Sequence, residues 1–285
     1  MVTRRALLAA MAGVVAAGPA GGATGPRIAA IDWAMAESAM ALGHPSLAVA
    51  ELKGLRRVAA SLPAETTVDL GLRGAPNLEA LSLSAPDLIL SSSYYSFIQP
   101  QLERIAPVLS QALYVPGEDP LPKLVALLPV LADALGDPGA AAPVLAEAEA
   151  SFDGLAGRLA GQERPFLLLE VGDARHVRIF GGDSLFGGTL HRLGRANAWT
   201  DGTQFAFHAP VPMERLADFP EAALVIAGEV PVQARRSLER GALWNRLAPV
   251  LRGDVLQLPE INAFGGLPSA LRFALELART AEGRG

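Results

Sequence analysis

Short apolar runs alternate along the chain with longer segments whose apolar residues recur every three or four positions. Residues 27–32 and 165–170 are apolar runs, and residues 87–90 and 223–226 are two more. Apolar runs of this length, separated by helical patterns, are typical of parallel β-strands that helices cover on both faces. The pattern therefore predicts an α/β fold.

An internal repeat indicates two lobes of the same plan. The hexamer Arg-Ile-Ala-Pro-Val-Leu at residues 104–109 returns as Arg-Leu-Ala-Pro-Val-Leu at residues 246–251, and each copy leads into a strand-like run that ends in proline. Three shorter matches keep the same order: Leu42-Gly43 with Leu193-Gly194, residues 78–81 with 213–216, and residues 87–90 with 223–226. Repeats of this kind reflect repeated structure. We expect each lobe to run strand, helix, strand, helix, strand.

A single amphipathic segment lies between the two repeats. Its apolar residues recur on one helix face: Leu145, Ala148, Phe152, Leu155 and Leu159. We expect residues 139–163 to form one helix that joins an N-terminal lobe, residues 24–138, stiffly to a C-terminal lobe, residues 164–285. The alternative is an ordinary crossover helix inside one domain.

The first residues have the layout of an export signal. Arg4 and Arg5 precede a short apolar run, and Ala20 and Ala23 offer cleavage positions. The arginine pair resembles a twin-arginine signal, and the apolar run is shorter than the roughly 20 residues that span a bilayer. We expect residues 1–23 to be a signal peptide and the mature chain to act in the periplasm. An uncleaved anchor helix is the alternative.

Composition and charge exclude several classes of protein. Of the 285 residues, 51% are hydrophobic and 19% are charged, which is ample for a core and excludes a disordered chain. The net charge is −5, and no basic cluster follows the N-terminus, which argues against nucleic acid as a partner. There is no cysteine, so the chain has no disulfide, thiolate zinc site or iron–sulfur cluster.

Signatures of catalysis are weak. The four histidines lack metal-ligand spacing, and there is no nucleophile elbow of the G-x-S-x-G type. The glycine-rich residues 181–188 lack the lysine of a P-loop, and we interpret them as a turn with Asp183 or Ser184 as a helix cap. Asp32 and Glu170 stand near strand ends without a paired group. We expect no enzyme and no cofactor; an exported α/β hydrolase is the alternative from another class.

The residues that follow the predicted strands are the candidates for ligand binding, because open α/β sheets bind ligands at the carboxyl ends of their strands. Arg73, between two glycines, suits oxygen acceptors. Tyr94 and Tyr95 point opposite ways on an extended chain, so at most one faces a cleft. Further candidates stand at other strand ends: Trp33, Phe205, Phe207, His208, Asn262 and Phe264. The alternatives are core packing for the aromatic residues, a surface ion pair for Arg73 and a hydrogen-bonding role for His208.

Several of these motifs resemble those of a known family. They are Gly-Leu-Arg and Pro-Asn-Leu-Glu within residues 68–81, the following Ser-Ala-Pro-Asp-Leu-Ile-Leu, Tyr95, residues 104–107, Arg175-His176, Phe180-Gly181, residues 183–186 and residues 197–199. Together they resemble the substrate-binding proteins of ferric-siderophore and cobalamin ABC importers, above all the ferric-hydroxamate-binding branch. The resemblance covers about residues 27–278.

The resemblance implies a fold and a function. The fold is that of a helical-backbone periplasmic binding protein, with two α/β lobes, one long joining helix and a shallow cleft that closes little. The ligand is a ferric siderophore, which carries its own iron, and the partner is an inner-membrane permease. An arginine and a tyrosine that bind hydroxamate oxygens match Arg73 and Tyr95, and aromatic residues of both lobes contact the rest. We expect a monomer.

The chain also departs from the family pattern. An expected tryptophan falls on Ala206, two expected aromatic residues correspond to Asn262 and Phe264, and the tryptophan of the loop before Leu62 is missing. The site is therefore less aromatic and more polar, with His208 and Arg178 as added polar groups. A mixed citrate-hydroxamate chelate is a hypothesis beside a pure hydroxamate. Cobalamin or haem on the same fold is the nearest rival.

Docking on the permease is implied by the resemblance as well. In this family, acidic side chains on both lobes meet arginines of the permease. Glu103, just before the first hexamer, and Glu239, shortly before the second, are the candidates. The alternative for each is an ordinary solvated glutamate.

Overall fold

The structure is a computed structural model that describes residues 25–203 and 207–283. The predicted signal peptide, residues 1–23, and Phe205 lie outside the described residues. Within these ranges, none of the helices combines the length and the apolar character needed to cross a membrane.

The first lobe is built on an all-parallel sheet with the strand order β3-β2-β1-β4-β5. Its strands are β1 (Ile28–Ala30), β2 (Ala48–Val49), β3 (Val68–Asp69), β4 (Leu88–Ser92) and β5 (Val108–Gln111). The segments between them form α2 (Trp33–Ala41), α3 (Leu52–Val58), α4 (Leu78–Leu83), the 3₁₀ helix η1 (Ser93–Ile98) and α5 (Gln99–Leu102). This lobe confirms the parallel α/β fold that the apolar runs predict.

The second lobe is built on a mixed sheet with the order β10-β9-β6-β7-β8. Its strands are β6 (Phe166–Val171), β7 (His176–Phe180), β8 (His208–Pro212), β9 (Ala223–Ile226) and β10 (Val255–Gln257). Its helical segments are α8 (Leu185–Arg192), η2 (Met213–Asp218), α9 (Val232–Arg240), η3 (Trp244–Arg246) and α10 (Ala248–Arg252).

The expectation that both lobes follow the same order of elements was wrong in the second lobe. β7 runs antiparallel to both β6 and β8, and no helix separates β6 from β7. The link at residues 172–175 is too short for the crossover that a parallel pair requires. The Asp173 carboxylate closes this link, because it accepts hydrogen bonds from the backbone N–H groups of Arg175 and His176.

The repeated motifs differ in how far their structures agree. Leu42-Gly43 and Leu193-Gly194 end α2 and α8 in the same way, with left-handed glycines at φ 84° and 66°. The two hexamers differ, because the first runs into β5 whereas the second forms η3 and α10. Residues 112–116, predicted to be strand-like, follow β5 as irregular chain.

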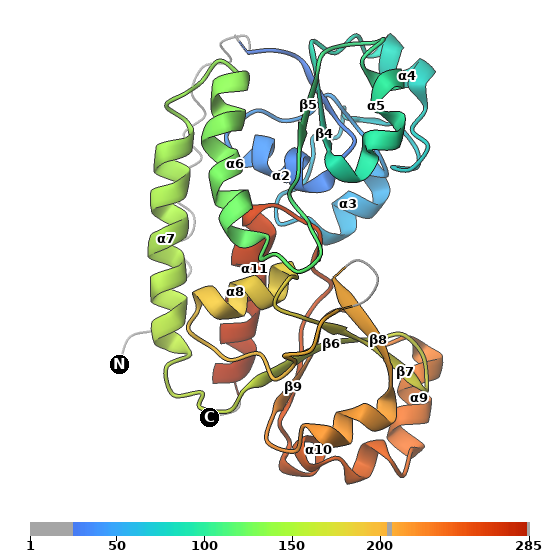
Figure 1. Ribbon diagram of the computed structural model, residues 1–285, viewed down its shortest axis with the longest axis vertical. Coiled ribbons are helices and arrows are strands. Elements are labelled where there is room, and N and C mark those ends of the chain that lie inside the picture. The colour runs from blue at the N-terminus through green and yellow to red at the C-terminus, as the bar shows by residue number, and fades with distance from the viewer. Residues whose placement is uncertain (1–24, 204–206, 284–285) are drawn as a thin grey trace.

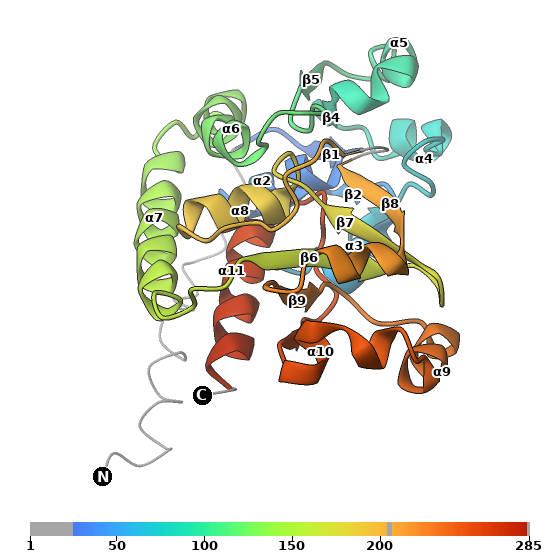
Figure 2. The same ribbon diagram turned by 60° about the horizontal axis from the view of Figure 1, so that its bottom comes forward.

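Three long helices join the lobes. They are α6 (Leu121–Ala134), α7 (Ala141–Arg158) and the C-terminal α11 (Leu267–Glu282). α7 is the long helix predicted between the lobes, and it lies along the edge of the molecule beside both (Figure 1). α11 comes last in the sequence, yet it packs against α7 and α8 and also against α2 and α6 of the first lobe (Figure 2).

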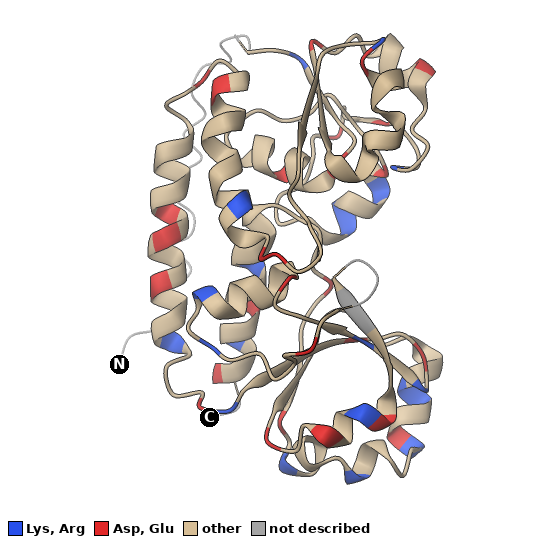
Figure 3. Ribbon diagram, in the orientation of Figure 1, with Lys and Arg blue, Asp and Glu red and all other residues tan. Residues whose placement is uncertain are grey.

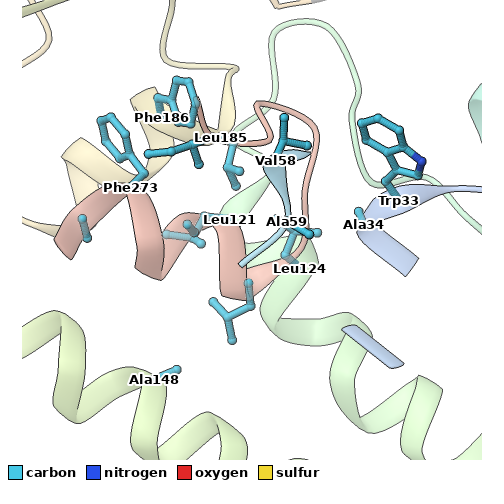
Figure 4. Packing of buried hydrophobic residues seen from close by; sticks show 14 of the residues in the cluster. Trp33, Ala34, Val58, Ala59, Leu121, Leu124, Ala148, Leu185, Phe186 and Phe273 are labelled. Atoms are coloured by element: carbon cyan, nitrogen blue, oxygen red, sulfur yellow. The ribbon is translucent and has the colours of Figure 1, made fainter. Parts of the chain in front are cut away.

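The main core is shared by both lobes. Phe186 of α8 stacks on Phe273 of α11, with ring centroids 4.5 Å apart. Val58 of α3 and Leu124 of α6 belong to the same buried cluster (Figure 4). The lobes therefore meet through a common hydrophobic core as well as through α7, which opposes free hinge motion.

A buried carboxylate fastens this junction. Glu37 of α2 is 1% exposed and accepts hydrogen bonds from Asn262 Nδ2 at 2.9 Å, Gly266 N at 2.9 Å and Ser269 Oγ at 2.6 Å. Asn262 and Gly266 lie in the segment that leads into α11, and Ser269 lies in its first turn. A buried carboxylate without such donors would be costly, so these bonds hold the C-terminal segment against the first lobe.

A second polar contact joins the lobes near α8. Asp183 Oδ2 accepts hydrogen bonds from Gly117 N, in the chain that leaves the first lobe, and from Thr203 Oγ1. Ser184, one of the two predicted caps, is the residue that caps α8 with its side chain.

The burial of Glu37 leads to a pH-dependent contribution to stability. Burial raises the pKa of Glu37 in the folded protein, whereas the unfolded chain keeps the ordinary value of 4.5. The folded state therefore binds this proton more tightly, and the contribution of Glu37 to the free energy of unfolding falls as the pH rises above about 4.5. Glu37→Gln removes this titration.

We expect the free energy of unfolding of the wild type, minus that of Glu37→Gln, to decrease from about pH 4 to about pH 7. Chemical denaturation of both proteins across this range measures the difference. A difference that stays constant or increases with pH would contradict the assignment.

Candidate functional site

The candidate site begins where β1 and β4 end. Asp32, directly after β1, caps α2: its Oδ1 accepts the Met35 N–H at 3.1 Å. Its Oδ2 accepts a hydrogen bond from the hydroxyl of Ser92, in β4, at 2.8 Å. Burial raises the pKa of Asp32, and the Met35 and Ser92 donors oppose that rise. These bonds fix the start of α2, and with it Trp33, at the carboxyl ends of the central strands.

Trp33 is the platform of the site. Its indole N–H donates to the Ala50 carbonyl at 2.8 Å, and its ring lies under the Arg73 guanidinium, 3.9 Å from the ring centroid. Gly54 of α3 makes room for the ring, because a Cβ at this position would meet Trp33 Cη2 at 2.8 Å. The strand-end prediction that Trp33 and Arg73 belong to one site is consistent with this stacking.

Arg73 is held on its other side by Glu51. Its Nε donates to Glu51 Oε2 at 2.5 Å. Glu51 itself has left-handed backbone, φ 52°, and its N–H donates to the Gly71 carbonyl at 2.5 Å in the turn that carries Arg73. Within the described residues the Nη1 and Nη2 groups have no hydrogen-bond partner. The guanidinium is thus oriented by the Nε hydrogen bond to Glu51 and by stacking on the Trp33 ring. Its Nη1 and Nη2 groups, the outer fork, are left for a ligand.

Tyr95 lies beside this pair, and Tyr94 does not share its environment. Tyr95 is 4% exposed and Tyr94 is 73% exposed. Both lie in the 3₁₀ helix η1, so the extended chain that sequence analysis assumed for them was wrong. Their rings meet edge to face at 5.1 Å. Burial raises the pKa of Tyr95, and the charges of Asp32 and Arg73 act on it as well. The phenol therefore keeps its proton at neutral pH and can donate, and it has no hydrogen-bond partner among the described residues.

An aromatic cluster lies at the lobe junction. Tyr114, Phe207 and Phe264 have ring centroids 5.4 to 5.7 Å apart, and the Tyr114 hydroxyl donates to the Gly265 carbonyl. Phe207 is buried and has left-handed backbone at φ 71°. Phe207 and Phe264 were predicted as ligand residues, and the structure brings both together with Tyr114, which sequence analysis missed because it stands inside a predicted strand.

Other predicted site residues have different surroundings. Asn262 is buried, with Nδ2 bonded to Glu37 and Oδ1 accepting the Phe264 N–H at 3.1 Å, so both polar atoms are engaged within the protein. His208 opens β8 and pairs with Phe180 through its backbone, while its side chain lies outside the description. The prediction of ligand contacts by His208 stays a prediction.

Arg178 stands on the second lobe with a partner of its own. It lies opposite Glu170 in the β6–β7 ladder, and its guanidinium is 3.6 Å from the Glu170 carboxylate. Arg178 shares its sheet face with Phe180, which packs in the core that both lobes share. This face is therefore turned toward the first lobe.

Hollows lie elsewhere on the described surface, among them one of about 560 Å³ between α7 and α11, one of about 850 Å³ beside α8 and one of about 530 Å³ at residues 161–165. Their polar side chains already fasten the fold. Arg158 pairs with Glu282, and Arg272 donates to the carbonyls at the end of α3. Asp183 joins the lobes, and Arg195 donates to backbone carbonyls after α7. The Nη groups of Arg73 and the hydroxyl of Tyr95 have no hydrogen-bond partner among the described residues. These donors favour the strand ends of the first lobe as the candidate site.

The site contains donors rather than metal ligands. Among residues 25–203 and 207–283, no group of three or more histidine or acidic side chains is arranged to hold a metal ion. Sequence analysis missed Glu51, although a carboxylate directly after the apolar residues 47–50 stands at a strand end. That position was the signal that could have found it.

Comparisons with known proteins agree with the fold. A family model described as "Periplasmic binding protein" matches residues 28–260. The iron(3+)-hydroxamate-binding protein FhuD of Escherichia coli K12 is 30% identical over 260 residues, which cover 90% of this chain and 88% of FhuD. These relatives are solute-binding proteins, not enzymes, and carry no cofactor.

Solved structures share the architecture. FhuD of Vibrio cholerae, described as bound to Fe³⁺-Desferal, superimposes with a TM-score of 0.83 at 20% identity, covering 90% of this chain and 97% of that one. The petrobactin-binding protein YclQ of Bacillus subtilis gives 0.76 at 17% identity, with coverage of 90% and 92%. The chain therefore belongs to the periplasmic binding protein family, as a relative of the iron(3+)-hydroxamate-binding protein FhuD.

Proposed function

We propose that the protein is the solute-binding component of an ABC importer for a ferric siderophore of hydroxamate or mixed citrate-hydroxamate type. The observation that carries the proposal is the Arg73 fork, oriented by Trp33 and Glu51 beside the protonated Tyr95 phenol. The names of two relatives support the ligand class, because one is called iron(3+)-hydroxamate-binding and one is described with Fe³⁺-Desferal.

The chemistry of such a ligand matches what the site offers. A ferric siderophore already surrounds its iron with oxygen ligands, so the protein supplies no metal ligand. It supplies donors to the outward lone pairs of those oxygens, which here are the Nη groups of Arg73 and the hydroxyl of Tyr95. Apolar and aromatic side chains then contact the carbon framework. The fixed donors lower the ordering cost of binding.

The location of the protein is part of the proposal. Residues 1–23 have the layout of an export signal, and the relatives belong to a family of periplasmic binding proteins. We propose that the signal is removed after Ala20 or Ala23 and that the mature protein works in the periplasm as a monomer. Its lobes are residues 24–138 and 164–285, with the connecting helix between them.

Delivery requires a face that meets the permease. Glu103 caps the end of α5 and Glu239 lies on α9, and both helices stand on the side of the molecule away from α7 (Figures 1 and 2). Glu239 shares α9 with Arg235, Arg236 and Arg240, whose charges oppose its own (Figure 3). Glu103 is therefore the stronger candidate for contact with permease arginines.

We expect Arg73→Ala to weaken ferric hydroxamate binding by about 1.5–3 kcal/mol, the range for hydrogen bonds to charged groups. Tyr95→Phe removes only the hydroxyl and should cost about 0.5–1.5 kcal/mol. Quenching of tryptophan fluorescence measures both affinities. Arg236→Ala, which removes an exposed arginine of α9, is the matched control and should bind as the wild type does. Unchanged affinity of Arg73→Ala would overturn the proposed function.

The clearance at Gly54 gives an independent prediction. Gly54→Ala places a methyl group against the Trp33 ring and should disturb the stack under Arg73, so siderophore affinity should fall. Gly157→Ala on α7 meets open space and should leave affinity unchanged while raising stability by up to about 1 kcal/mol. Titration and thermal melting of both variants provide the comparison; equal affinities would argue against the role of Trp33.

The docking face can be tested apart from ligand binding. We expect Glu103→Arg to abolish most stimulation of the permease ATPase in proteoliposomes, since it places like charges at the contact, whereas siderophore affinity stays unchanged. Glu239→Arg should have a smaller effect because its surroundings are already basic. Full stimulation by Glu103→Arg would exclude this glutamate from the interface.

A further inference from the structure

The charge of Arg73 is already matched inside the protein. Its Nε makes a hydrogen bond with the Glu51 carboxylate, and the Asp32 carboxylate lies close enough for Arg73 to act on its pKa. In the second lobe, Arg178 is matched by Glu170. Among the described candidate residues, the site therefore has directed donors without an excess of positive charge.

Glu51 holds its place at a conformational cost. Its backbone is left-handed at φ 52°, a region where residues other than glycine are uncommon. Such positions cost free energy and occur where the surroundings over-determine them, often at binding sites. Here the strained backbone points a carboxylate at Arg73, whose Nη fork is left for a ligand, which calls for a role beyond closing a turn.

The same carboxylate lies near any group that Arg73 binds. A ligand oxygen on the Nη fork sits within a few ångströms of Glu51, because both contact one guanidinium. A neutral or cationic chelate gains the Arg73 donors at no electrostatic cost. A chelate with a free carboxylate gains the same donors but is repelled by Glu51, whose charge cancels the attraction of Arg73 at longer range.

We propose that Glu51 is a specificity-determining residue that makes the site select ferric chelates by charge, favouring cationic and neutral cages over those with free carboxylates. This inference rests on the proposed function and narrows it, because it places hydroxamates above mixed citrate-hydroxamate chelates. The favoured ligands are ferric chelates whose net charge is positive or zero. Trp33 and Arg73 contribute to the affinity for every ferric chelate, and Glu51 makes that affinity depend on the charge of the chelate.

Three chelates that share one iron cage and differ in net charge test the proposal. Ferrioxamine B has a free ammonium group, its N-acetyl derivative is neutral, and its N-succinyl derivative has a carboxylate. The mature wild type should bind the N-succinyl form roughly tenfold more weakly than the N-acetyl form at low salt, as a like charge a few ångströms away implies. In Glu51→Gln this ratio should fall to about one or invert.

Two controls isolate the charge of Glu51 from its place in the turn. Glu51→Asp keeps the carboxylate and should keep the order of the three ligands. Glu147→Gln, on the exposed surface of α7, makes the same change in net charge and should leave the ratio at the wild-type value. The wild-type ratio should also shrink as salt is raised, because screening weakens the repulsion.

The outcomes separate this inference from the proposed function. If the wild type binds none of the three chelates, the proposed function fails with it. If it binds all three and Glu51→Gln leaves the ratio unchanged, the charge selection is wrong and the siderophore site stands. If Glu51→Gln loses all binding, the salt dependence of the wild-type ratio decides, and a ratio independent of salt overturns the proposal.

Discussion

The Glu37 carboxylate can stay buried only while the C-terminal segment supplies its three donors, and the arrangement of the protein follows from this requirement. Glu37 lies in the middle of α2, whose N-terminus presents Trp33 to the site. The donors Asn262, Gly266 and Ser269 belong to the last part of the chain. One helix therefore links the lobe junction to the ligand platform. Displacement of either lobe would break buried hydrogen bonds and disturb the stack on which Arg73 rests.

The candidate binding groups are oriented by contacts with neighbouring protein groups. Trp33 is oriented by the Ala50 carbonyl, and Arg73 by Trp33 and Glu51. Tyr95 is fixed by burial in the core of the first lobe. Arg73 thus keeps its Nη fork for a ligand, whereas the single N–H of Trp33 is used within the protein. Donors prepared in this way suit a preformed cage without large closure, which agrees with two lobes that share one core.

Much of the fold could be predicted from apolar runs, because buried parallel strands leave a strong signal in sequence. The strands after residues 27 and 165 and the glycine ends of α2 and α8 are examples. The hairpin of β6 and β7 was missed, since a repeat of side chains at residues 104–109 and 246–251 suggested a repeat of structure. These two hexamers, which differ at one position, adopt different structures: one enters a parallel ladder and the other contributes to η3 and α10. Arg73, Trp33 and Tyr95 could be nominated from strand ends, and Glu51 could have been nominated in the same way, whereas Tyr114 depends on contacts between distant segments.

The position of α11 has a consequence for how the chain is made. A helix that is synthesised late completes the core of the lobe that was synthesised earlier, since α11 packs on α2 and the segment at its start brings the donors for Glu37. The first lobe therefore reaches its final packing only after residues 262–282 have been synthesised. A shorter chain leaves the Glu37 carboxylate without its three donors, at the place where the longer chain joins its two lobes.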